Sequence, residues 1–129
     1  MNKREINIIE LEGEAYKCKS CKTHLALATD IVSRAFHTSR GQAYLFHTVM
    51  NINVGDHEKR MMISGMHTVA DISCCCCGQI LGWKYEAVDH ETQKYKEGKF
   101  VLERVSITDG VDSELNANAH SATSETKDA

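Results

Sequence analysis

The sequence predicts a small domain made mostly of antiparallel β-strands, arranged as two sheets or as a partly open barrel. Most apolar segments are short, rich in β-branched and aromatic residues, and partly alternate between apolar and polar positions. Glycines interrupt these segments at turn or bulge positions, and two Cys-x-x-Cys pairs indicate a metal that joins distant parts of the chain. With 129 residues, the chain is long enough for one modest hydrophobic core.

Six segments have the composition and the partial alternation that are typical of strands. In chain order they are Asp30–Phe36, Gln42–Asn51, Arg60–Ser64, Thr68–Ser73, Ile80–Val88 and Phe100–Thr108. The glycines that interrupt or follow them are Gly41, Gly55, Gly65, Gly82 and Gly98. The polar stretch from Asp89 to Gly98 is expected to form either a helical turn or a long hairpin loop.

The two ends of the chain differ in composition from the strand-rich middle. Residues 1–13 carry charges where a signal peptide has its apolar core, so they are not a secretory signal. We expect them to form an N-terminal arm, either flexible or added to a sheet as an edge strand, before a domain at residues 14–108. Residues 109–129 are rich in Ser, Thr, Asn, Ala and Asp and have no aromatic residue, which predicts a disordered acidic tail.

Charge and hydropathy argue against two classes of partner. The formal net charge of −3 argues against nucleic acid, because a nucleic-acid-binding surface needs clustered Lys and Arg. The densest basic group, Lys17, Lys19 and Lys22, is interrupted and is expected to keep a loop solvated. No apolar run approaches the roughly 18–20 residues of a membrane span. We therefore expect an intracellular protein that binds neither nucleic acid nor a membrane.

Six cysteines carry the clearest chemical signal in the sequence. In a reducing compartment, metal-binding or catalytic roles are commoner for cysteines than disulfides. Cys18 and Cys21 form one Cys-x-x-Cys pair, and within the run CCCC only Cys74 and Cys77 repeat that spacing. Two such turns supply the four thiolates of a tetrahedral site, for which zinc is the commonest occupant. Because a closed sulfur shell leaves no position for water, we predict one structural Zn²⁺ bound by these four residues.

Other interpretations of the cysteines stay open at this point. A single rubredoxin-like iron uses the same four ligands, whereas an iron–sulfur cluster lacks its usual closely spaced third cysteine in the first segment. Gly78 directly follows the last cysteine and suits the positive φ that such a turn often needs. Cys75 and Cys76 are expected to be solvated or to donate their backbone N–H groups to zinc-bound sulfurs, with redox sensing as a further alternative.

Beyond the cysteines, the chain resembles the Yippee-like family of small eukaryotic zinc-binding proteins. The matching stretches are GQAYLF (41–46), GMHTVADI (65–72), LGWKYE (81–86) and KYKEGKFVLE (94–103). The resemblance runs from about Tyr16 to Ile107, and the family's four zinc ligands fall on Cys18, Cys21, Cys74 and Cys77. It implies a β-tent, in which two antiparallel sheets meet at an angle and zinc joins them at the apex. The Mis18 kinetochore module, the thalidomide-binding domain of cereblon and the B-type methionine sulfoxide reductases have similar folds.

The family implies a function less directly than it implies a fold. Its members are linked to cell-cycle and proliferation control, to a nuclear or centrosomal location and, in some cases, to a multi-subunit ubiquitin ligase. No shared enzymatic activity defines it. Sulfoxide reduction needs a nucleophilic thiolate away from the structural zinc. In the similar reductases this cysteine lies on a late strand, and here no cysteine follows Cys77. We therefore expect a non-enzymatic protein-interaction module, a regulator or adaptor in the nucleus, the cytoplasm or both, with a ubiquitin-ligase assembly among its candidate partners.

The segment Gly82–Tyr85 supports an alternative function. Trp83 and Tyr85 are two residues apart on a predicted strand, so their side chains share one face. The segment resembles a Gly-Trp-Lys-Phe stretch that forms walls of an aromatic ligand cage in cereblon-like domains, and His67 is the nearest candidate for another wall. A pocket for a small ligand or a degron, built from His67, Trp83 and Tyr85, is therefore the alternative to simple packing of these side chains in the core.

Overall fold

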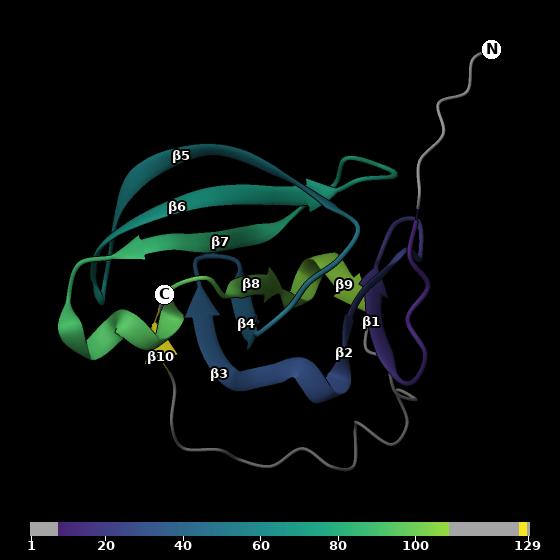
Figure 1. Ribbon diagram of the computed structural model, residues 1–129, viewed down its shortest axis with the longest axis horizontal. Helices are drawn as coiled ribbons and strands as arrows, with labels where there is room; N and C mark the ends of the chain where they lie inside the picture. The colour runs from purple at the N-terminus through teal and green to yellow at the C-terminus, as the bar shows by residue number, and fades with distance from the viewer. Residues whose placement is uncertain (1–7, 109–126, 129) are drawn as a thin grey trace.

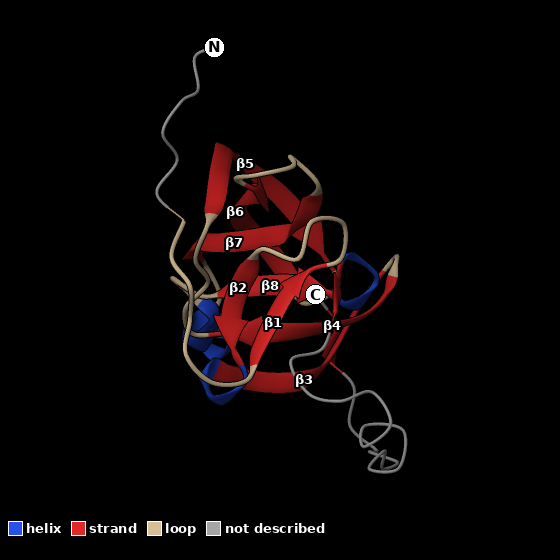
Figure 2. Cartoon of the chain, turned by 90° about the vertical axis from the view of Figure 1, so that its right-hand side faces the viewer, coloured by secondary structure: helices blue, strands red, loops and turns tan. Residues whose placement is uncertain are grey.

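The strands form two sheets in the computed structural model of the chain, which describes residues 8–108 and 127–128 (Figures 1 and 2). The smaller sheet has the strand order β2-β1-β9, and the larger has the order β10-β3-β4-β8-β7-β6-β5. Among the described strands, only β10 and β3 pair in parallel, and the other pairs are antiparallel. The mostly-β class and the two-sheet architecture predicted from the sequence are confirmed.

The strands of the described part of the chain are short except in the middle of the larger sheet. Their bounds are β1 Ala15–Cys18, β2 His24–Leu27, β3 Ile31–Thr38, β4 Gly41–Phe46, β5 Ile52–Met62, β6 Gly65–Cys74, β7 Ile80–Val88, β8 Phe100–Glu103, β9 Ile107–Thr108 and β10 Lys127–Asp128. Short 3₁₀ helices connect some of them: η1 Ala28–Asp30, η2 Glu91–Lys96 and η3 Arg104–Ser106. The helix η2 follows the end of β7 at one side of the larger sheet (Figure 1).

Several predicted strands differ from the observed ones at their ends. The strand predicted from Gln42 stops at Phe46, after which the chain leaves the sheet. The next strand, β5, begins at Ile52 instead of Arg60. It is an edge strand whose middle, residues 55–59, is exposed and has no apolar residue besides Gly55, so the alternation of Ile52 and Val54 does not continue through it. The strand predicted over Phe100–Thr108 is divided by η3.

The strand β10 lies where a disordered tail is predicted. Within residues 8–108, two further strands, β1 and β2, have no counterpart among the predicted segments. Each is four residues long, which is too short to establish an alternation. β1 pairs with β2 on one side and with β9 on the other, so the smaller sheet joins both ends of the domain. The polar stretch before β8 forms the helical turn η2, one of the two forms expected for it.

The described start of the chain lies against the domain through polar contacts. Ile9 donates its backbone N–H to the side-chain oxygen of Asn51 at 3.0 Å, and its carbonyl accepts from the Asn51 amide at 2.9 Å. The Leu11 N–H donates to Nδ1 of His24 at 3.0 Å. Residues 1–7, part of the expected N-terminal arm, lie outside the described residues.

Most of the expected C-terminal tail, residues 109–126 and 129, also lies outside the described residues. The described part is β10, which lies beside β3 (Figure 1). Lys127 pairs with Phe36, and Asp128 pairs with His37. These two residues therefore extend the larger sheet at the β3 edge.

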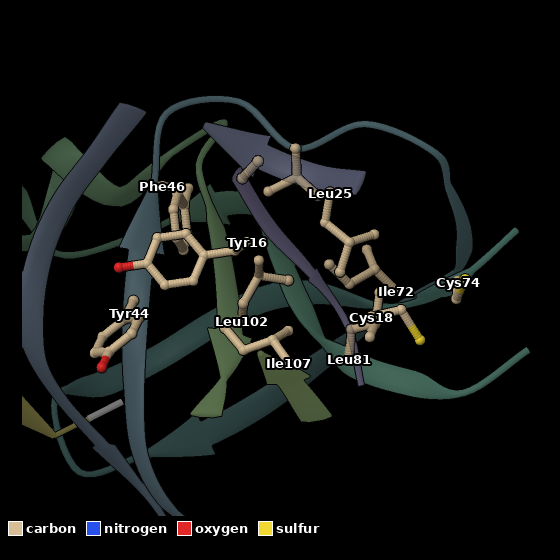
Figure 3. Packing of buried hydrophobic residues seen from close by; sticks show 12 residues of the cluster. Tyr16, Cys18, Leu25, Tyr44, Phe46, Ile72, Cys74, Leu81, Leu102 and Ile107 are labelled. Carbon is tan, nitrogen blue, oxygen red and sulfur yellow. The ribbon is translucent and has the colours of Figure 1, made fainter. Parts of the chain in front are cut away.

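The first hydrophobic cluster fills the space between the two sheets (Figure 3). Tyr16 of the smaller sheet packs edge-to-face on Phe46 and Tyr44 of the larger sheet, with ring centroids 5.2 and 5.7 Å apart. At the other end of the cluster, Cys18 and Cys74 are buried beside aliphatic side chains (Figure 3). This cluster therefore brings one cysteine of each pair to the same end of the inter-sheet core.

A second cluster covers the opposite face of the larger sheet. On β4, Tyr44 and Phe46 belong to the first cluster, while Ala43 and Leu45 between them belong to the second. This is the alternation expected of a central strand buried on both faces. The buried members of the second cluster are Phe36, Ala43, Leu45, Val69, Trp83, Tyr85, Val88 and Val101.

Candidate metal centre

The first cysteine pair lies on a tight turn at the end of β1. Cys18 is the last residue of that strand, and its backbone N–H donates to the Thr23 carbonyl at 2.9 Å. Inside this loop, the Lys22 N–H donates back to the Cys18 carbonyl at 2.8 Å. The Cys21 sulfur lies 3.0 Å from the Thr23 hydroxyl. These bonds turn the chain through Cys18 and Cys21 so that both thiols face the same side.

The second pair lies on an equivalent turn at the end of β6. The Cys74 N–H donates to the Gln79 carbonyl at 2.9 Å, and the Gly78 N–H donates back to the Cys74 carbonyl at 2.9 Å. Gly78 has φ 81°, which confirms the positive φ expected for it, and Lys22 has φ 65° at the same position of the first turn. The two turns thus repeat the same hydrogen bonds, although the sequences around them differ.

The two turns bring the sulfurs of Cys18, Cys21, Cys74 and Cys77 together. These four ligand atoms all lie within 4.8 Å of one another. The Cys18 and Cys77 sulfurs are 3.6 Å apart, and the Cys21 and Cys74 sulfurs are 3.5 Å apart. A disulfide needs about 2.05 Å, whereas tetrahedral zinc with 2.3 Å bonds separates its sulfurs by about 3.8 Å. The arrangement therefore fits a tetrahedral metal and not a pair of disulfides.

The protein environment shifts the pKa values of the two thiols of the first turn in opposite directions. Burial raises the pKa of Cys18 to about 12. A hydrogen bond with the Thr23 side chain lowers the pKa of Cys21 to about 6. Since zinc binds thiolates, the cation would have to displace the Cys18 proton, and metal binding at this site is coupled to proton release.

The two remaining cysteines of the CCCC run take no part in the group. The Cys75 N–H donates to the Asn51 carbonyl at 2.9 Å, so it is not available to a zinc-bound sulfur. Burial raises the pKa of the Cys75 thiol, which disfavours the reactive thiolate that redox sensing needs. Cys76 is exposed at the turn.

The three residues of the expected ligand pocket lie together, in and beside the second cluster. The His67 and Tyr85 ring centroids are 5.3 Å apart, and Trp83 packs edge-to-face on Tyr85 at 6.2 Å. His67 and Tyr85 are fully buried, and Trp83 is 8% exposed. Their packing supports the core interpretation for Tyr85 and His67.

These side chains nevertheless keep unused polar atoms. Within the described structure, His67 Nε2, Trp83 Nε1 and the Tyr85 hydroxyl have no hydrogen-bond partner of good geometry. His67 Nδ1 lies 2.8 Å from the Gly65 carbonyl, so Nδ1 carries the proton and Nε2 is a bare acceptor. Burial lowers the pKa of His67 and raises the pKa of Tyr85, with the Trp83 side chain opposing the Tyr85 shift in part.

A cavity of about 580 Å³ opens beside Trp83. Its walls come from the turn between β3 and β4, from the β5–β6 hairpin and from the two strands β7 and β8. The lining residues are His37, Thr38, Ser39, Arg60, Met61, Met62, Ile63, Trp83 and Glu103. Of the three predicted pocket residues, Trp83 alone lines this cavity.

Lys96 is a buried residue of this region that the sequence does not single out. Its ammonium group lies 3.1 Å from the Ser64 hydroxyl, and 5.3 and 5.4 Å from the ring centroids of Phe36 and Tyr85. Such cation–π contacts are favourable when the cation is desolvated. Lys96 lies in a polar stretch that resembles a solvated loop, so its burial becomes visible only once η2 packs on the sheet.

Comparisons with known proteins agree with the cysteine group. The family described as "Yippee zinc-binding/DNA-binding/Mis18, centromere assembly" matches residues 15–121. The chain belongs to the Yippee/Mis18 family. A yippee-like protein of Arabidopsis thaliana is 58% identical over 123 residues, which cover 94% of this chain and 95% of that protein. Human yippee-like 3 is 48% identical over 88 residues, which cover 68% of this chain and 74% of that protein.

The fold of this Yippee/Mis18 chain also has a solved counterpart. A crystal structure of the Mis18 Yippee-like domain superposes with a TM-score of 0.56, covering 73% of this chain and 91% of that one. At 12% identity, this likeness shows a shared fold. The predicted β-tent relationship is thereby confirmed.

Family and geometry together identify the cofactor. The family is a zinc-binding one, and the four-cysteine group is suited to one zinc ion, so the predicted Zn²⁺ is confirmed. The description of the family includes binding and centromere assembly, and it names no catalysed reaction. Across the residues described, no helix combines the length and apolar character that crossing a bilayer requires.

Proposed function

We propose that this chain is a non-enzymatic protein-interaction module, a regulator or adaptor held in shape by one structural zinc. The observation that carries this proposal is an apolar hairpin tip on the larger sheet. At the β5–β6 turn, Met61 is 68% exposed and Ile63 is 79% exposed, with Met66 also exposed beside them. Grouped apolar side chains in water commonly mark interaction surfaces, and methionine adapts to partners of varied shape.

The zinc ligands in this proposal are Cys18, Cys21, Cys74 and Cys77. Cys18 belongs to the smaller sheet and Cys74 to the larger, so an ion bound by both joins the two sheets. With four protein sulfurs around it, the metal has no open position for a substrate, which supports a structural role. Elemental analysis of the purified protein separates zinc from the rubredoxin-like iron that the same ligands accept.

The interaction role is tested by quantitative affinity capture from the organism's own cell extract. The bait variant carries Met61→Ser and Ile63→Ser, and a matched control carries Val105→Ser, which removes an exposed apolar side chain elsewhere. We expect the hairpin variant to lose its specific partners by about tenfold or more, because burying each apolar side chain contributes about 1.5–3 kcal/mol. Capture of an unchanged set of proteins by the hairpin variant would contradict the proposal.

The class of partner follows from the family and from the charge of the chain. Cell-cycle components and a ubiquitin-ligase assembly are the candidates that the family resemblance supplies, in the nucleus or the cytoplasm. The family description also includes DNA binding, but a net charge of −3 does not favour phosphate contacts. A salt-dependent mobility shift with DNA or RNA would revive that alternative.

A second candidate function is recognition of a small ligand or a degron by the Trp83 pocket. It is supported by the 580 Å³ cavity that Trp83 lines. Burial of His67 and Tyr85 away from that cavity argues against a full aromatic cage. Titrating a cyclic imide while following Trp83 fluorescence tests it: quenching supports a ligand pocket, and partners retained by Trp83→Ala must use another surface.

A further inference from the structure

The edge of β3 already accepts an extended segment. Lys127 and Asp128 pair with Phe36 and His37 in parallel, so the added segment runs in the same direction as β3 (Figure 1). β3 ends at Thr38, and both His37 and Thr38 line the Trp83 cavity. A segment that pairs with this edge and continues in the same direction therefore leads to the mouth of the cavity.

The sheet register decides which side chain of such a segment faces the cavity. Phe36 lies opposite Ala43, and Ala43 lies opposite Glu103, so all three share one face. Thr38 is two residues after Phe36 and is on the same face, where its hydroxyl donates to Glu103 at 3.0 Å. Asp128 lies opposite His37. If a partner segment pairs in the same register, its next residue lies opposite Thr38. Its side chain therefore points to the face that carries the cavity.

The cavity wall offers no unpaired charge to that side chain. Glu103 accepts from Arg40 at 2.9 Å as well as from Thr38. Arg60 donates to Glu58 and, at 3.2 Å, to Asp71. Beside these charged residues, the β3–β4 turn gives the wall a polar side, and the opposite side is apolar, formed by Met61, Met62, Ile63 and Trp83. An uncharged, large apolar side chain fits this wall, whereas a carboxylate or an ammonium would lose hydration without gaining a free counter-charge.

We infer that the β3 edge and the Trp83 cavity together form a docking site for an extended segment of a partner protein. The segment pairs in parallel with β3 and places a large apolar side chain in the cavity. This inference rests on the protein-interaction role proposed above and gives that role a surface and a class of ligand. Because Lys127–Asp128 of the chain itself occupies the same edge, it competes with the partner segment.

Binding of three fluorescein-labelled, C-terminally amidated peptides tests the inference. SETKDL contains residues 124–128 followed by leucine, and SETKDG and SETKDE differ in the last side chain alone. The proteins are the zinc-loaded full chain and its Lys127→Pro, Asp128→Pro variant, in which proline removes both N–H groups of the segment, including whichever one faces β3. In fluorescence anisotropy, we expect SETKDL to bind the proline variant about tenfold more tightly than the glycine or glutamate peptide, and more tightly than it binds the unchanged chain.

The location of binding is checked by two further measurements. NMR spectra should show shifts at the Phe36 and His37 amides and at the Trp83 indole N–H when SETKDL binds. Met62→Glu should abolish the advantage of leucine, provided that zinc content and melting temperature are unchanged; if the variant is unfolded, the NMR shifts decide. Equal affinities for the three peptides, no binding, or shifts elsewhere would overturn the inference. The protein-interaction role has its own test. If the inference fails but the bait with Met61→Ser and Ile63→Ser still loses its partners, the interaction role remains supported.

Discussion

At the scale of single residues, the four cysteines of the CCCC run have the same side chain but different surroundings, because of their positions in the turn. Cys74 and Cys77 face the sulfurs of the first turn, whereas Cys75 and Cys76 lie between them and outside the group. Equal spacing of the two outer residues predicts from the sequence the same pair that the fold places beside the first turn. The hydrogen bond from Cys75 to Asn51 was not foreseeable, because Asn51 approaches the turn only in the folded chain.

Serine substitutions along the run should separate the two kinds of cysteine. We expect Cys74→Ser and Cys77→Ser to lose zinc and cooperative folding, because structural zinc contributes about 10–16 kcal/mol in zinc-finger peptides and a domain has about 5–15 kcal/mol in total. Cys75→Ser and Cys76→Ser serve as matched controls and should keep one zinc per chain. Metal analysis and circular dichroism melting measure both outcomes; equal metal loss in all four variants would argue against these ligands.

His67 should make the stability of the domain depend on pH. Burial lowers its pKa below the ordinary value of 6.5, so the unfolded chain binds a proton more readily than the folded one. The contribution of His67 to the free energy of unfolding should therefore be constant above about pH 7 and should fall as the pH drops below 6.5. Lys96, which also faces His67, contributes in the same direction, whereas Asp89 opposes it.

Urea denaturation between pH 7.5 and pH 5.5 measures this dependence, with zinc content followed in parallel. His67→Asn is the comparison variant, since its side-chain amide can still donate to the Gly65 carbonyl but does not titrate. We expect the variant to lose the extra decline in stability at the acid end. A decline of the same size in both proteins would assign the effect to other groups.

At the scale of elements, β7 is the strand that the sequence defines best. Its predicted and observed bounds are both Ile80–Val88, because it carries a long apolar pattern and lies inside the larger sheet. β5 lies at the edge, and its middle, residues 55–59, is exposed and has no apolar side chain, so the strand has no continuous pattern. The cavity was not predictable for a different reason: Met61 and Ile63 reach it only through the pairing of β5 with β6.

Gly82 explains how β7 packs so closely on its neighbour. A Cβ atom at this position would lie 1.9 Å from the Val101 carbonyl oxygen of β8, a distance that no side chain tolerates. We expect Gly82→Ala to destabilise the domain by about 3 kcal/mol or more, because backbone atoms must move apart. Gly55→Ala is the matched control, since its nearest atom would be 3.3 Å away, and it should cost less than about 1 kcal/mol. Chemical denaturation compares the two variants; equal costs would contradict the close approach.

At the scale of the whole molecule, the zinc site and the first hydrophobic cluster both hold the two sheets together. The first cluster contains residues of both sheets, and Cys18 and Cys74 belong to it. We expect removal of zinc by a strong chelator to lower the melting temperature sharply and to expose this cluster, because the folded state loses a ligand that the unfolded chain binds weakly. Binding of a hydrophobic dye and calorimetry report the change. An unchanged melting temperature in metal-free protein would show that the cluster suffices alone.

The separation of the two cysteine turns along the chain also sets an order of events during biosynthesis. The first turn leaves the ribosome early, but its sulfurs remain half a site until the end of β6 has been made. β9, which completes the smaller sheet, is synthesised later still. The nascent amino-terminal segment therefore has only two of the four sulfurs, too few for the tetrahedral site, until most of the domain has emerged.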